Sequence, residues 1–214
     1  MPTGVTTVSS SDSSPSSPLP APERARSRVW ASLLFSSLAV VIYLGPALGE
    51  WFAYDRTAIA AGQLWRLVTG HWTHWTADHL AWDLVVFAVL GVFWERTGRR
   101  RAFLVCVFGS ALLISLAVWL VLPEMALYRG LSGVDCALVT AVTFQSLRRS
   151  ARSGQHGLSL ALTAVLAGYF LKVLYELATG STLFVNSENA TFIAVPLAHL
   201  VGGVFGLAVG LREK

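Results

Sequence analysis

The 214-residue sequence has little charge: Asp, Glu, Lys and Arg make up 13% of it, against about 25% in soluble domains. Hydrophobic residues make up 54%. This balance excludes an ordinary soluble domain and indicates a membrane protein with several spans. Cysteine is also scarce, and Cys106 and Cys136 both lie within apolar runs, so a structural disulfide is not expected.

Residues 1–28 contain few large apolar side chains and are rich in Ser, Pro and Thr. Such a segment cannot bury enough surface to fold, so we expect a disordered cytoplasmic tail. Residues 29–214 are then expected to form one membrane domain.

Six apolar runs approach the roughly 20 residues that a membrane-spanning helix needs. They cover residues 29–48, 79–95, 102–122, 132–147, 157–178 and 191–211. The segment 57–78 is amphipathic and aromatic, which is typical of a segment lying in the membrane interface. The fold class predicted is therefore an all-α bundle of six transmembrane helices.

The basic residues predict the orientation of these spans. Twelve of the 16 Lys and Arg residues fall before the first span, between spans two and three, between spans four and five, and after the sixth. These positions lie on one side of an alternating six-span protein, and the positive-inside rule makes that side cytoplasmic, with both termini. A net charge of +4 spread in this way suggests the lipid bilayer, and not nucleic acid, as the partner.

Among the polar residues inside the predicted spans, five stand out: His79, Asp83, Ser132, Asp135 and His199. Ionisable side chains are costly in a bilayer, so each is a functional candidate. Counting along each helix to its cytoplasmic arginines places all five roughly 20–25 Å from that side, at about 1.5 Å per residue. Three separate helices thus bring polar groups to one level.

A hydroxyl and an imidazole at one depth can form a nucleophile and its general base. Ser132, in the stretch YRGLSGVD, begins its span, where unpaired N–H groups are available to an oxyanion. Gly130 and Gly133 permit a tight approach of the backbone there. Behind His199, small residues recur at four-residue spacing, which favours close helix packing; they are Gly202, Gly206 and Gly210.

Other interpretations of these residues remain open. A serine between glycines in an apolar helix is often a packing residue, and a buried histidine can belong to a proton path. His71, His74 and His79 could be metal ligands, but no acidic pair completes a convincing set, so neither a metal nor a cofactor is expected. A small transporter or channel would also carry polar groups at this depth, but we find no internal repeat of the kind common in transporters.

Taken together, three motifs resemble the rhomboid family of intramembrane serine proteases. GLSG is similar to the motif of the rhomboid nucleophile, AHLVGGVFG to the segment that carries the histidine, and HWTHWTADHLAWD to the segment that enters the second span. The resemblance extends over about residues 60–211. It implies a six-helix fold, catalysis by Ser132 and His199, and a role for His79 in holding the oxyanion.

Two positions depart from the rhomboid pattern. Asp83 stands where rhomboids carry an asparagine near the oxyanion, so it is expected either to be protonated or to orient His79. Cys136 stands where rhomboids often carry an aromatic residue that packs on the histidine. Tyr169 or Tyr175 is then expected to brace His199.

Further supporting residues can be named around this site. Asp83, Gly130 and Gly133 are expected to support the oxyanion site beside His79, and Asp135 and His74 are further candidates for a supporting role. Asp135 could also be a third catalytic member beside the serine and the histidine, although a rhomboid dyad needs none.

The sequences HWTHWTADHLAWDL and YRGLSGVD resemble the rhombosortase branch of the family more closely than they resemble general rhomboids. The resemblance implies a bacterial inner-membrane enzyme that acts on single-span membrane proteins and removes a glycine-rich C-terminal sorting tail. The alternative is a rhomboid-like scaffold that binds membrane clients without cutting them. Such scaffolds usually lack the serine or the histidine, and both residues are present here.

Overall fold

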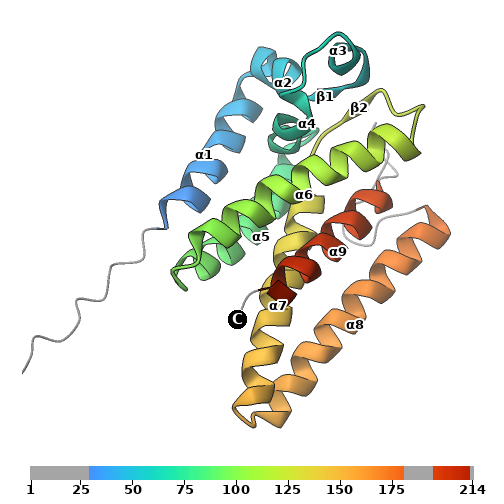
Figure 1. Cartoon of the computed structure of the whole chain (residues 1–214). Helices are drawn as coiled ribbons and strands as arrows, with labels where there is room; N and C mark the ends of the chain where they lie inside the picture. The colour runs from blue at the N-terminus through green and yellow to red at the C-terminus, as the bar shows by residue number, and fades with distance from the viewer. Residues whose placement is uncertain (1–28, 181–194, 213–214) are drawn as a thin grey trace, which may run out of the picture.

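The computed structural model describes residues 29–180 and 195–212, which form a helical bundle with one short β-ribbon (Figure 1). The tail expected at 1–28 and the first residues of the span expected at 191–211 lie outside the described residues. In chain order the elements are α1 (Trp30–Leu44), α2 (Pro46–Phe52), β1 (Tyr54–Asp55), α3 (Arg56–Ala60), α4 (Arg66–Thr69), η1 (Gly70–Trp72), α5 (Ala77–Glu95), α6 (Arg100–Val121), β2 (Leu127–Tyr128), α7 (Ser132–Arg152), α8 (His156–Thr179) and α9 (Pro196–Arg212).

Three of the described helices, α5, α6 and α8, are long and apolar enough to cross a membrane. A fourth span results if α1 and α2 are taken together, although they meet at an angle of 114°. Pro46 is the first residue of α2, and because proline has no N–H it cannot continue the hydrogen bonding of α1. The apolar α9 is shorter than the other three. The chain is therefore an all-α membrane protein.

The segment expected in the membrane interface, 57–78, contains the short helices α3, α4 and η1 rather than one spanning helix. It is fixed to the bundle by Arg56, whose guanidinium donates to the carbonyls of Val118, Trp119 and Leu122 at 2.9–3.1 Å. Those carbonyls lie at the C-terminal end of α6, where the last carbonyls of a helix can accept hydrogen bonds from outside it. Tyr54 and Asp55 also pair with β2, so this connection is held in place at the end of α6.

Helix α7 lies inside the bundle and contacts α5, α6, α8 and α9. In Figure 1, α9 lies between α6 and α8. The first turns of α7 are almost wholly buried, including Asp135 and Thr140. Because protein rather than lipid surrounds this helix, it can carry polar side chains at a depth where a lipid-facing helix could not.

The glycines of α9 face α7, as their four-residue spacing predicts. A Cβ added at Gly202 would overlap the carbonyl of Gly133, and one added at Gly206 would overlap the carbonyl of Ala137. The Thr140 hydroxyl donates to the Gly203 carbonyl across the same contact, at 2.8 Å. Small residues thus allow backbone-to-backbone packing, which brings the beginnings of the two helices together.

The outer surface of the bundle is apolar. On α8, Leu160 is 73% exposed and Leu171 is 66% exposed, while the buried residues of this helix are Tyr169, Val173 and Glu176. Extensive exposed apolar surface is unusual in a soluble monomer but is expected where a helix faces lipid. The face of α8 that turns inward is therefore narrow and partly polar.

Candidate active site

Ser132 is the first residue of α7 and follows a sharp turn of the chain. Gly130 makes that turn with a φ of +125°, a conformation that L side chains rarely adopt. A Cβ at this position would also strike the ring of His79. Replacement of Gly130 would therefore disturb both the backbone turn and its packing against His79.

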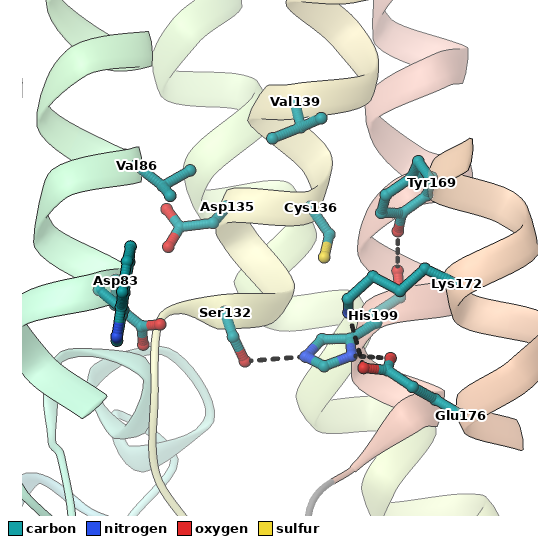
Figure 2. Close-up of a pocket in the computed structure, with 11 residues that line it drawn as sticks. Asp83, Val86, Ser132, Asp135, Cys136, Val139, Tyr169, Lys172, Glu176 and His199 are labelled. Carbon is teal, nitrogen blue, oxygen red and sulfur yellow. Dashed lines mark hydrogen bonds and ion pairs between the residues drawn. The ribbon is translucent and has the colours of Figure 1, made fainter. Parts of the chain in front are cut away.

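His199 of α9 reaches the serine directly. Its Nε2 lies 3.1 Å from Ser132 Oγ (Figure 2). Ser132 is partly exposed, whereas His199 is only 7% exposed. The structure thus brings the two predicted catalytic residues within hydrogen-bond distance, from helices whose close packing depends on glycine.

The other ring nitrogen of His199 contacts an acidic residue that sequence reasoning missed. Nδ1 lies 2.8 Å from Glu176 Oε2, and Lys172 Nζ lies 2.8 Å from the other carboxylate oxygen (Figure 2). Both partners belong to α8. A signal was available, because Lys172 and Glu176 are two ionisable residues one turn apart within a predicted span, and such residues are functional candidates.

Tyr169 braces His199, as expected for one of the two tyrosines considered. Its hydroxyl donates to the His199 carbonyl at 2.6 Å. The ring packs with Cys136 and Val173, so the small cysteine leaves room for the tyrosine of the neighbouring helix. Tyr175 is 47% exposed and is not the brace.

Asp83 holds the turn that precedes the nucleophile. Its Oδ2 accepts the Leu131 N–H at 2.8 Å and lies 3.1 Å from His74 Nε2 and 3.4 Å from His79 Nε2. One backbone N–H and two imidazole nitrogens therefore surround one buried oxygen atom. Of the two roles expected for Asp83, these contacts match the orientation of His79. They show that Asp83 also contacts His74 and the Leu131 N–H.

Replacing Asp83 with leucine is expected to destabilise the protein by about 2–5 kcal/mol, because the Leu131 N–H and His74 would be buried without their acceptor. Asp83→Asn keeps one acceptor oxygen and should cost less. Thermal unfolding of the purified protein in detergent measures both changes. The matched control is Asp78→Leu, at an exposed position of the same helix. Equal unfolding temperatures for Asp83→Leu and the control would contradict this role.

His71 lies apart from the cluster around Asp83. Its Nε2 contacts the Ala111 carbonyl at 2.9 Å and Ser115 Oγ at 3.2 Å. Complete burial lowers the pKa of His71 to about 4, so the ring is neutral at physiological pH. Within residues 29–180 and 195–212, no three His, Cys, Asp or Glu side chains are placed to share a metal ion. Of the three histidines considered as ligands, His74 and His79 therefore meet at Asp83, whereas His71 contacts α6.

A cavity of about 390 Å³ opens beside Ser132. Its walls come from α5, α7, α8 and α9 and include Trp82, Asp135, Lys172 and His199. Asp135 lies on the α5 side of the nucleophile, near Val86, whereas Glu176 lies on the opposite side (Figure 2). In the described part of the chain, Asp135 Oδ1 is buried without a hydrogen-bond partner. Asp135 thus lines the cavity without contacting His199, and the carboxylate bonded to His199 is that of Glu176.

The remaining supporting glycine lies where α7 and α9 are closest. A Cβ at Gly133 would strike Ile114 of α6 and the Ala198 carbonyl beside His199. In chemical terms the site contains a hydroxyl, an imidazole in contact with it, a carboxylate behind the imidazole, and the first turn of a helix beside the hydroxyl. This set of groups is suited to acyl transfer by a serine nucleophile.

Comparison with known proteins identifies a family for the chain. The family model for the Rhomboid domain matches residues 61–213, which include Ser132, Glu176 and His199. No curated protein sequence matches the chain. The match covers most of the chain and every element from α4 to α9.

Proposed function

The chain belongs to the rhomboid family, whose members are generally intramembrane serine proteases, and we propose that it cleaves membrane proteins with Ser132 as nucleophile and His199 as general base. The observation that carries the proposal is the distance of 3.1 Å between Ser132 Oγ and His199 Nε2. Both atoms border a cavity of about 390 Å³ that a peptide segment can enter.

The proposed reaction has two steps. Ser132 Oγ attacks the substrate carbonyl carbon as His199 Nε2 takes the hydroxyl proton, which it then gives to the departing amine, leaving an acyl-enzyme. A water molecule, deprotonated by the same nitrogen, then attacks the acyl carbon; the bond to Ser132 Oγ breaks, and Oγ takes the proton back from His199. The oxyanion of each tetrahedral intermediate is stabilised by the Ser132 backbone N–H and by His79, while Asp83 and Gly130 position the turn that precedes the nucleophile.

We propose six spans, with both termini in the cytoplasm of a bacterial inner membrane. Contacts between charged helix ends support this arrangement. Arg148, near the end of α7, donates to the carbonyl of Leu211 at the end of α9, at 2.9 Å. The carboxylate of Glu95, at the end of α5, accepts a hydrogen bond of 2.6 Å from the hydroxyl of Ser32, at the beginning of α1. Helix ends that the positive-inside rule assigns to one side thus contact one another in pairs.

The substrates proposed are single-span proteins with a glycine-rich C-terminal sorting tail, as in the rhombosortase branch. Glycine destabilises a helix by about 1 kcal/mol per residue, so a glycine-rich junction can unwind at little cost. It can then present an extended peptide bond to Ser132. This step explains why a tail of that composition would be recognised beside a membrane helix.

Co-expression of the protein with a glycine-rich, C-terminally anchored substrate is expected to release a shortened product. Ser132→Ala and His199→Ala should leave the anchor in place, as judged by gel mobility and by membrane fractionation of the substrate. A second substrate, with the glycines replaced by leucine, is the control. If the control is cut equally well, the proposed specificity is wrong; if wild type binds the substrate without cutting it, the scaffold function replaces the protease.

A further inference from the structure

The polar network continues beyond the expected Ser–His pair into α8. Glu176 is completely buried, and one of its carboxylate oxygens lies 2.8 Å from His199 Nδ1. It is one of the three buried residues of a helix whose surface is otherwise largely exposed. A buried carboxylate needs specific partners to offset its loss of hydration, and two of them are His199 and Lys172.

The direction of the hydrogen bonds follows from the chemistry of the groups. An ionised carboxylate only accepts, so His199 Nδ1 must carry the proton that it donates to Glu176. In that tautomer, Nε2 has a free lone pair and accepts the Ser132 proton. Lys172 Nζ, 2.8 Å from Oε1, keeps the carboxylate ionised and fixes its orientation.

Resting on the proposed function, we propose that Glu176 is the positioning residue of a Ser132–His199–Glu176 triad and that Lys172 holds its carboxylate in place. Glu176 keeps the imidazole in the tautomer that can receive a proton, and it stabilises the imidazolium formed as Ser132 attacks. The proton moves only between Ser132, His199 and the leaving amine, so the carboxylate remains ionised throughout. Asp135 is not needed for this task.

The decisive variant is Glu176→Gln, which preserves size and removes the charge. Its amide NH₂ can donate to His199 Nδ1 and so favour the tautomer that cannot accept the Ser132 proton. We expect kcat to fall about 10²- to 10⁴-fold with KM within about twofold of wild type, since both oxygens of Glu176 are engaged by His199 and Lys172. Glu176→Asp, which keeps the carboxylate, should recover much of the loss, and Lys172→Met should show a smaller decrease in kcat.

The matched control is Glu95→Gln. Glu95 is also a buried glutamate, but its carboxylate contacts α1, where it accepts the Ser32 N–H at 2.8 Å. It should lower thermal stability and leave kcat within about twofold. A readout independent of turnover is the ¹⁵N NMR signature of the His199 tautomer, assigned by its absence in His199→Gln. In Ser132→Ala protein the proton should be on Nδ1, and adding Glu176→Gln should move it.

The outcomes separate the inference from the function on which it rests. Full kcat in Glu176→Gln, with Ser132→Ala inactive, would overturn the triad and leave a protease with a dyad. Equal losses of kcat in Glu176→Gln and Glu95→Gln would also overturn it, because the effect would then be structural. Cleavage by Ser132→Ala would instead overturn the proposed function. If Glu176→Gln fails to fold, the His199 tautomer in Ser132→Ala protein still decides: a proton on Nε2 instead of Nδ1 would overturn the triad.

Discussion

A fluorophosphonate probe is expected to label the wild-type protein covalently at Ser132, and Ser132→Ala is expected to abolish that labelling. The reaction needs an activated hydroxyl: Oγ attacks phosphorus, fluoride leaves, and the proton passes to His199. Since Nε2 lies 3.1 Å from Oγ, His199→Ala should slow labelling by about 10³-fold or more. The measurement is the rate of label incorporation into purified protein, followed by identification of the labelled peptide.

The control for this experiment is a second serine in the bundle. Ser110 is buried in α6, and its hydroxyl donates to the Val107 carbonyl within the same helix. Ser110→Ala should therefore label at the wild-type rate. Labelling of Ser132→Ala at that rate would show that the reactive residue lies elsewhere and that GLSG is a packing motif. The probe requires no substrate, so its result does not depend on which membrane protein is cleaved.

The positions of Ser132 and His199 could be predicted because two independent features of the sequence agree. Both residues lie at one depth when counted from their cytoplasmic arginines, and Gly202 follows His199 at a spacing that permits close packing. The depth of a residue in the membrane and the size of its neighbours in the helix are local properties that the sequence of one helix gives. Together these two properties predict that the helices of Ser132 and His199, α7 and α9, contact each other.

Glu176 was missed because its role depends on how α8 is rotated. The sequence places Lys172 and Glu176 one turn apart in an apolar span. It does not show which side of that span faces the other helices. Rotation is set by the packing of Tyr169 and Val173 against α7 and α9. The asymmetry of α8, with leucines outside and these residues inside, becomes evident only in the folded bundle.

The span limits show a similar division between local and tertiary effects. Five of the predicted runs agree with helices to within a few residues at their N-terminal ends, because long apolar runs are a strong local signal. The bend between α1 and α2 was not anticipated, although Gly45 and Pro46 mark it in the sequence. The predicted run 132–147 and α7 begin at the same residue, although α7 is surrounded by protein and does not need an apolar surface on every side.

Replacing Gly202 with alanine is expected to reduce both stability and catalysis, although only one methyl group is added. Its Cβ would overlap the Gly133 carbonyl, so α9 must move away from α7. Overpacking of this kind costs about 1–3 kcal/mol. Displacement of His199 from Ser132 by about 1 Å can lower the rate about 10²-fold. Thermal unfolding and the rate of fluorophosphonate labelling measure the two effects on the same sample.

The matched control is Gly168→Ala on α8, where an added Cβ meets no atom within 4 Å. Alanine there should be neutral or should stabilise the helix by about 0.5–1 kcal/mol, with labelling unchanged. Gly206→Ala, whose Cβ would overlap the Ala137 carbonyl, should resemble Gly202→Ala in stability. If Gly202→Ala unfolds and labels as Gly168→Ala does, the contact between α7 and α9 does not hold the catalytic pair together. If Gly202→Ala loses labelling along with stability, the glycines of α9 are needed because they bring a base on one helix within 3.1 Å of a nucleophile on another.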